Sequence, residues 1–217
     1  MIQFPESTYF GKRVPKESFY QRLDMNSTIK RAFIDDIDQI VWQNKLSPDT
    51  LNIGSGARVL EIEVFYIYLK HKDYNPKLIE VIEKAIPKHL LFVLIFQEEK
   101  KLLINYKEES DHHKGQFKIV ETYASDWSQS AEIMLSLDGL NIDQIYDGFI
   151  RQIAGSRIAA AEEEIKHSVE KAQTIAKLEM KIAALETKKR KEKQFNKQVE
   201  ISNEIKRLKS LICNQEL

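Results

Sequence analysis

The stretch from Val59 to Leu69 constrains the fold of this chain more than any other part of its sequence. It reads VLEIEVFYIYL, without glycine or proline, and only two of its side chains, Glu61 and Glu63, are charged. Strands buried on both faces have this composition, because β-branched and aromatic side chains pack well on a pleated surface. We therefore expect this segment to be a strand near the centre of a sheet.

Three further segments are expected to be strands of the same sheet. Residues 90–96 form a strongly apolar run, and residues 116–123 alternate between apolar and polar side chains. The polar residues 97–101 can turn the first of these segments back into another apolar segment, 102–106. The sequence thus predicts a small mixed sheet.

Apolar residues at helical spacing predict the helices that cover this sheet. Residues 10–16 form a polar connector. Pro15, near the end of this connector, suits the first turn of a short helix. The apolar positions that follow favour a helix from about residue 29 to 46, ending before Pro48. A further helix is expected over residues 76–86, with Asn75 as its cap and Pro76 in its first turn. The fold class is α+β, in the order α-α-β-α-β-β-β.

The distribution of proline and glycine divides the chain into two regions. Every proline lies at or before Pro87, and the last glycine is Gly155. We therefore predict a globular α+β domain over residues 1–140 and a helical region over residues 141–217. The first helix of that region is expected to begin after Asn141, whose side chain suits the N-cap position.

The helical region contains two apolar series whose members are three and four residues apart. They are Ile175, Leu178, Ile182 and Leu185, and then Ile201, Ile205, Leu208 and Ile212. Continuing the first series by heptads reaches only charged and polar residues, so one uninterrupted coiled-coil seam does not fit. Folding the chain back near Lys191 pairs the two series and favours an antiparallel helical hairpin. Because the run from Lys188 to Lys193 has no turn former, a bent helix in a homodimeric coiled coil stays open.

Composition excludes several classes of protein. Thirty-three basic residues balance thirty-three acidic ones, so no global field favours nucleic acid or an acidic membrane. The single cysteine, Cys213, excludes an internal disulfide framework and a cysteine-based zinc site. The first residues lack the basic region and apolar core of a signal peptide, so none is expected, and the longest apolar run, Leu90 to Phe96, is too short to span a bilayer. A cytoplasmic protein is expected.

Glu61 and Glu63 are the first candidates for site chemistry. In a strand they lie on one face, roughly 7 Å apart. Paired strand carboxylates can hold Mg²⁺ for phosphodiester hydrolysis, as in nucleases whose strand carries Glu-x-Lys with an upstream acid. Here the second position is Glu63, so Lys45 or Asn44 would have to assist. The alternative is structural: the carboxylates form ion pairs with Lys12, Arg13 or Lys45, or lie where the sheet meets solvent.

Two other features bear on nucleotide and nucleic-acid binding. The chain has no Gly-rich phosphate loop, so no motif predicts nucleotide binding. A basic run, Lys188, Lys189, Arg190 and Lys191, can contact nucleic-acid phosphates, although it lacks interleaved aromatic residues. A solvated helix turn is the favoured interpretation, with weak DNA binding as the alternative.

Five motifs follow one another along the chain. They are Phe10-Gly-Lys-Arg-Val-Pro-Lys, Val41-Trp-Gln-Asn-Lys-Leu-Ser-Pro-Asp-Thr-Leu-Asn-Ile, Leu60-Glu-Ile-Glu-Val-Phe, Ile86-Pro-Lys-His-Leu-Leu-Phe and Glu192-Lys-Gln-Phe-Asn-Lys-Gln-Val-Glu. In this order the chain resembles the prokaryotic domain-of-unknown-function family catalogued as 4391. The resemblance implies a family without an established activity, encoded beside helicases and DNA methyltransferases of restriction-like or phage-defence clusters.

The segment from Trp42 to Thr50 is the most distinctive of these motifs. A helix end does not need Asn44, Lys45 and Thr50 together, so these residues are expected to form a polar surface near the acid pair. A loop that ends a helix would use them as well.

Two functions from different classes follow from these observations. The first is a non-catalytic accessory subunit of a restriction-like or phage-defence complex, docking onto a helicase or methyltransferase through its C-terminal helices. The second is a metal-dependent nuclease that uses Glu61 and Glu63, with Lys45 assisting.

Overall fold

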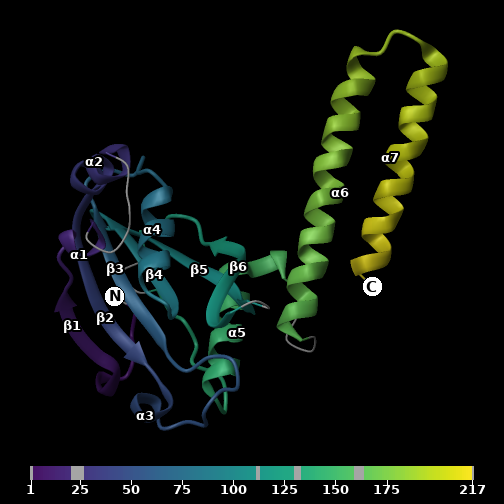
Figure 1. The fold of residues 1–217 in the computed structure, drawn as a ribbon. Helices are drawn as coiled ribbons and strands as arrows, with labels where there is room; N and C mark the ends of the chain where they lie inside the picture. The colour runs from purple at the N-terminus through teal and green to yellow at the C-terminus, as the bar shows by residue number, and fades with distance from the viewer. Residues whose placement is uncertain (1, 21–26, 111–112, 130–132, 159–163, 217) are drawn as a thin grey trace. The chain divides into compact units, whose positions relative to one another are not determined.

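The computed structural model describes residues 2–20, 27–110, 113–129, 133–158 and 164–216, which divide into two compact units. The first unit, Met1–Gly155, is built on one six-stranded mixed sheet. The second, Ser156–Leu217, contains the long helices α6 (Ile165–Lys191) and α7 (Phe195–Glu216). The predicted α+β fold with a C-terminal helical hairpin is confirmed (Figure 1).

The strands lie in the sheet in the same order as in the chain. They are β1 (Tyr9–Arg13), β2 (Ile37–Leu46), β3 (Ile62–Leu69), β4 (His89–Phe96), β5 (Glu99–Ser110) and β6 (His113–Ala124). All neighbours are antiparallel except β3 and β4, which are parallel and are joined through α4 (Lys77–Ala85). The central position of β3 confirms the prediction made for this stretch, although the strand begins at Ile62 and not at Val59.

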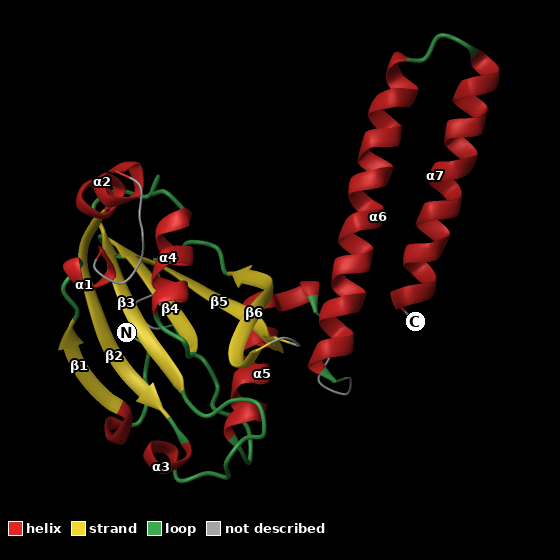
Figure 2. Cartoon of the chain, in the orientation of Figure 1, coloured by secondary structure: helices red, strands yellow, loops and turns green. Residues whose placement is uncertain are grey.

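Short helices complete the first unit, and three of them pack on one core cluster. The short elements are η1 (Glu6–Thr8), α1 (Glu17–Tyr20), α2 (Ser27–Asp36), α3 (Pro48–Leu51) and α5 (Ile142–Ala154), while η2 (Gly155–Arg157) includes the first residues of the second unit. Phe19 of α1, Phe33 of α2 and Leu78 of α4 are buried with Phe65 of β3 and Phe92 of β4. Helix α5 packs instead against β5 and β6 (Figure 2).

The predicted helix over residues 29–46 is wrong in its second half. Helix α2 ends at Asp36, and Ile37–Leu46 form strand β2, which pairs with β3. The register between these strands shifts between Ile37 and Gln39 and again between Trp42 and Asn44. Such bulges interrupt the two-residue alternation of a strand. The buried residues therefore fall at spacings of three and four, which resemble a helical pattern.

The expected polar connector over residues 10–16 is also partly wrong. Its first residues belong to β1, an edge strand that pairs with β2. Four of the five residues of β1 are exposed, and Gly11 has a positive φ of 62° where the register shifts. An exposed edge strand carries no apolar alternation, so its sequence resembles a loop.

Helices α6 and α7 form the hairpin that pairing of the two apolar series predicted. Ile182, Ile201, Ile205 and Leu208 are buried in one cluster, on which Leu178, Leu185 and Ile212 pack, while Ile175 is half-buried. The turn between α6 and α7 is stabilised by Glu192, a residue type without an intrinsic preference for turns. The carboxylate of Glu192 accepts hydrogen bonds from the backbone N–H groups of Lys193 and Gln194, at 2.8 and 2.9 Å. Within the described residues, no helix is long and apolar enough to cross a bilayer.

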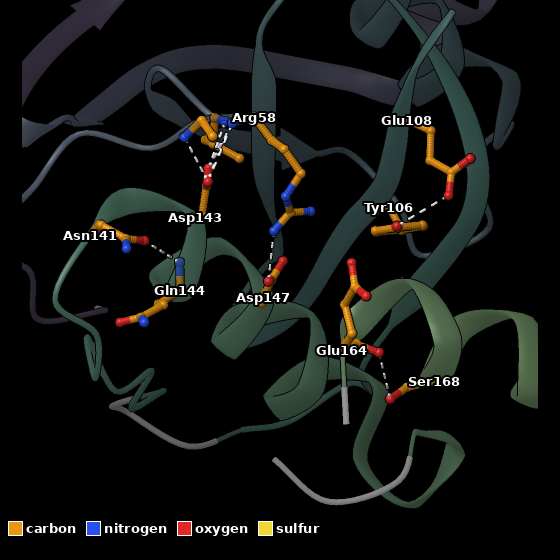
Figure 3. Close-up of polar contacts among 11 residues, drawn as sticks. Arg58, Tyr106, Glu108, Asn141, Asp143, Gln144, Asp147, Glu164 and Ser168 are labelled. Carbon is orange, nitrogen blue, oxygen red and sulfur yellow. Dashed lines mark hydrogen bonds and ion pairs between the residues drawn. The ribbon is translucent and has the colours of Figure 1, made fainter. Parts of the chain in front are cut away.

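Asp143, in the first turn of α5, fixes the segment that leads into β3. Its carboxylate accepts backbone hydrogen bonds from Ala57 at 2.8 Å, Arg58 at 3.2 Å and Val59 at 2.7 Å (Figure 3). The Arg58 guanidinium also binds Asp147, one turn further along α5, at 2.7 Å. These bonds set the position of the chain two residues before Glu61.

We predict that Asp143→Ala lowers the free energy of unfolding by about 1–3 kcal/mol, because three backbone donors lose their acceptor. Asp143→Asn, which keeps one acceptor oxygen, should lose less. Urea unfolding followed by tryptophan fluorescence measures this, since Trp42 and Trp127 both lie in the first unit. An Asp143→Ala protein as stable as the parent would contradict the anchoring role.

Candidate functional site

A pocket with a volume of about 370 Å³ lies beside the start of β3. Its walls come from α1, β2, β3 and the segment after α4. The apolar part includes Phe19, Trp42, Phe65, Ile86 and Pro87, and the polar part includes Lys45, Glu61, Glu63 and Lys88. The structure therefore brings both predicted carboxylates and the predicted lysine into one site.

Glu61 is held between two lysines. Lys45 Nζ lies 2.6 Å from Glu61 Oε2, and Lys88 Nζ lies 2.5 Å from Glu61 Oε1. Burial alone would raise the pKa of Glu61, but the two ammonium groups outweigh it, so this pKa is lowered. The hydrogen bond to Glu61 in turn raises the pKa of Lys45. Glu61 is therefore ionised at neutral pH, and both its oxygens are occupied.

Glu63 has a different environment, although only one residue separates it from Glu61. Its side chain is 3% exposed, and its Oε2 atom is buried without a hydrogen bond. The indole Nε1 of Trp42 is also buried without one; it lies near enough to lower the pKa of Glu63 without reaching good hydrogen-bonding geometry. Burial, with the charge of Glu61, outweighs this effect and raises the pKa of Glu63 to about 7.

The sheet register explains how residues from distant parts of the chain meet here. Lys45 of β2 stands opposite Glu63 of β3, which places its long side chain within reach of Glu61. On the other side, Glu63 stands opposite Leu90 of β4, and Lys88 lies two residues before Leu90. The lysines therefore approach Glu61 from the two strands that flank β3.

The distinctive segment from Trp42 to Thr50 contributes both to the site and to local structure. Trp42 and Lys45 line the pocket. Asn44 does not, because its buried amide donates to Thr8 Oγ1 at 2.9 Å. Ser47 and Thr50 form a capping box at the start of α3. The expectation of a polar surface near the acid pair thus holds for Lys45, while Asn44 and Thr50 have structural roles.

The charges of the pocket limit its chemistry. Two lysines face two carboxylates, one of which titrates near pH 7, so the site is neutral to weakly positive. A divalent cation needs free, ionised oxygen ligands. Both oxygens of Glu61 are bonded to ammonium groups, and the part of the chain that is described contains no group of three potential metal ligands. The donor set therefore suits a ligand with hydrogen-bonding groups better than a metal ion.

The other predicted residues lie in the second unit. The eight apolar residues proposed to bind a partner occupy the inner side of the hairpin, where all but Ile175 belong to its core cluster. Lys188, Lys189, Arg190 and Lys191 are exposed in the last turn of α6. Phe195 follows at the start of α7 with 75% of its surface exposed.

Sequence reasoning did not assign Lys88 or Trp42 to the site. Lys88 follows Pro87 at the end of α4, and only the parallel pairing of β3 with β4 brings it to Glu61. Both residues lie in motifs of the family resemblance, Ile86-Pro-Lys-His and Val41-Trp. The motifs mark these residues but do not indicate that they lie beside Glu61 and Glu63.

Comparison with known proteins gives a family and no activity. The family model described as "Domain of unknown function (DUF4391)" matches residues 2–212, nearly the whole chain. Neither the curated proteins nor the solved structures include a match.

We predict that Glu63 makes the first unit less stable as the pH rises from 4.5 to 7. The native state retains the proton of Glu63 over this range while the unfolded state releases it, so stability present below pH 4.5 is lost by pH 7. The difference of about 2.5 pH units corresponds to about 3 kcal/mol. Glu63→Gln removes this dependence. Urea unfolding of both proteins at pH 5 and pH 7.5 tests it; an equal stability difference at both values would show that Glu63 titrates normally.

Proposed function

The chain belongs to the family described as Domain of unknown function (DUF4391), and from that premise we propose that it is a non-catalytic accessory subunit. It docks onto a larger protein partner through the α6–α7 hairpin. The observation that carries this proposal is the surface at the turn of the hairpin, where an exposed aromatic side chain lies among basic residues.

The hairpin buries its apolar seam within a single chain, so we place the docking surface outside the seam. Ile182, Ile201, Ile205 and Leu208 are each at most 9% exposed. This packing supports an amended version of the docking hypothesis, in which the contact is made by residues outside the seam. A homodimer through these helices stays a prediction, which light scattering on the purified chain tests.

We call residues 188–200 the hairpin tip. This segment contains six basic and two acidic residues. Phe195 is 75% exposed and Val199, one turn later on the same side of α7, is 42% exposed. Aromatic residues at the centre of a polar rim are the usual energetic anchors of protein interfaces. The tip therefore fits a partner surface with an apolar depression and an acidic border.

The family context supplies the class of partner. The resemblance of the sequence motifs implies a helicase or a DNA methyltransferase of a restriction-like or phage-defence cluster. A subunit that only docks needs no catalytic residues, which agrees with a pocket where Glu61 is bonded to two lysines.

We predict that Phe195→Ala combined with Lys189→Glu reduces recovery of the partner at least tenfold, because the variant removes the apolar anchor and reverses one basic charge. Tagged full-length protein is isolated from its native host, and copurified helicase or methyltransferase is quantified by mass spectrometry. The matched control is Met180→Ala with Lys177→Glu, which changes an equally exposed apolar residue and a lysine on α6.

Circular dichroism establishes that both variants keep their helices, and nuclease treatment of the lysate removes bridging DNA and RNA. Loss of the partner from the tip variant alone supports the proposal. Equal recovery with all three proteins contradicts it. If nuclease treatment abolishes recovery of the partner protein, the proposal of direct docking is contradicted as well. The hairpin tip would then bind nucleic acid and not the partner protein.

The alternative function is a metal-dependent nuclease, favoured by the meeting of Glu61, Glu63 and Lys45 in one pocket. We predict no cleavage of DNA or RNA by the purified protein with Mg²⁺ or Mn²⁺, because a metal would have to displace two lysines from Glu61. Cleavage that the double variant Glu61→Gln, Glu63→Gln abolishes would replace the accessory role with the nuclease.

A further inference from the structure

We propose that the pocket beside β3 binds a guanine nucleotide, with the base edge on Glu63 and Trp42 and the phosphate toward Lys45 and Lys88. This inference concerns the first unit and goes beyond docking by the hairpin. The observations that support it are the poorly hydrogen-bonded polar atoms at the pocket, its aromatic walls and its two lysines.

The unsatisfied atoms specify hydrogen-bonding groups on the ligand. Trp42 Nε1 and Glu63 Oε2 are buried and neither makes a well-directed hydrogen bond, although the two groups lie close enough for the indole to lower the pKa of Glu63. Glu63 is 97% buried and lines the pocket. Burying a polar group without a hydrogen bond costs free energy. A ligand that supplies the missing hydrogen bond removes this cost, which strengthens its binding. The ligand therefore presents an acceptor to the indole N–H and donors to the carboxylate.

Guanine presents this pattern along one edge. Its O6 atom accepts, and the adjacent N1–H and 2-amino groups donate to the two oxygens of a carboxylate. The Glu63 side chain has to rotate toward the pocket to meet such an edge, because its Oε2 atom is buried in the structure. Enzymes that hold a single base read it in this way, through its hydrogen-bonding edge and aromatic contacts. Adenine offers neither the O6 acceptor nor the N1–H donor.

The walls suit a flat heteroaromatic ring. Phe19, Trp42 and Phe65 line the pocket, and Trp42 and Phe65 are nearly parallel, with 15° between their planes. Stacking on aromatic side chains stabilises any base, whatever its sequence context. The volume of about 370 Å³ lies within the range of small-ligand sites.

The two lysines at the pocket supply donors that a phosphate can use. The side chains of Lys45 and Lys88 are 38% and 41% exposed, so their ammonium groups remain accessible to solvent. Each ammonium has three donors, and Glu61 occupies one of them. The remaining donors can bind a phosphate. No Gly-rich loop is needed, because side chains and not backbone N–H groups hold the ligand.

Isothermal titration calorimetry of the full-length chain with GMP, IMP and AMP tests the inference. IMP lacks the 2-amino donor and should bind about tenfold more weakly than GMP, as expected for one lost hydrogen bond to a charged group. AMP should bind more weakly than IMP. Glu63→Gln should reduce GMP affinity at least tenfold, and Lys88→Ala should reduce the preference for GMP over guanosine.

Two controls keep this test separate from the docking proposal and from misfolding. Phe195→Ala with Lys189→Glu alters only the hairpin tip, so it should bind GMP as the parent does even if partner docking fails. Thermal unfolding followed by tryptophan fluorescence establishes that Glu63→Gln and Lys88→Ala are folded.

A guanine-containing single-stranded oligonucleotide, added in competition with GMP, distinguishes the source of the nucleotide. Stronger binding of the oligonucleotide assigns the pocket to a base within a strand, and failure to compete assigns it to a free nucleotide. Absence of saturable GMP binding up to millimolar concentration overturns the inference, as does equal affinity for GMP, IMP and AMP or an unchanged affinity in Glu63→Gln.

Discussion

The structure of the site depends on two carboxylates on one face of an otherwise apolar strand, of which only one has counter-charges. Glu61 binds two lysines, one from each side of β3. Glu63, two residues further into the sheet, is 3% exposed and has no cation in contact among the described ion pairs. Burying a carboxylate without a partner favours its protonated form, and the pKa of Glu63 near 7 expresses this cost.

A second buried acid in the same unit shows how the fold treats a carboxylate that is purely structural. Glu83 of α4 is 4% exposed and forms an ion pair with Lys107 of β5, itself 7% exposed. Lys107 also donates to the backbone carbonyl of Lys88. The ion pair gives Glu83 a counter-charge, although burial still raises its pKa and both its oxygens lack a well-directed hydrogen bond. Glu63 differs because no lysine or arginine is paired with it among the described ion pairs and because it borders a pocket.

The sequence predicted those parts of the fold whose pattern is local. The composition of β3, the cap at Asn141 and the paired apolar series of the hairpin each depend on residues close in the chain, and each agrees with the structure. Strand β2 was mistaken for a helix because its two bulges move buried residues to helical spacing. Edge strand β1 was missed because it buries too little to show a pattern.

The candidate site was only half predictable for the same reason. Glu61 and Glu63 share a strand, so alternation placed them together, and Lys45 followed from a motif. Lys88 reaches the site through the pairing of β3 with β4, and Trp42 through the register of β2, neither of which is encoded locally. The turn of the hairpin was likewise unexpected, because Glu192 supplies through its carboxylate the hydrogen bonds that a turn-forming residue would give.

Glu63 is a buried carboxyl group without a paired cation among the described ion pairs, and it borders the pocket beside β3. The most direct measurement is an NMR titration of the Glu63 side-chain carboxyl carbon in the ligand-free protein, assigned by comparison with Glu63→Gln. We expect a titration midpoint near pH 7 for Glu63, with Glu61 ionised throughout the range from pH 5 to 8. A midpoint near 4.5 for Glu63 would contradict it, because the carboxylate would then be as well solvated or paired as one on the protein surface.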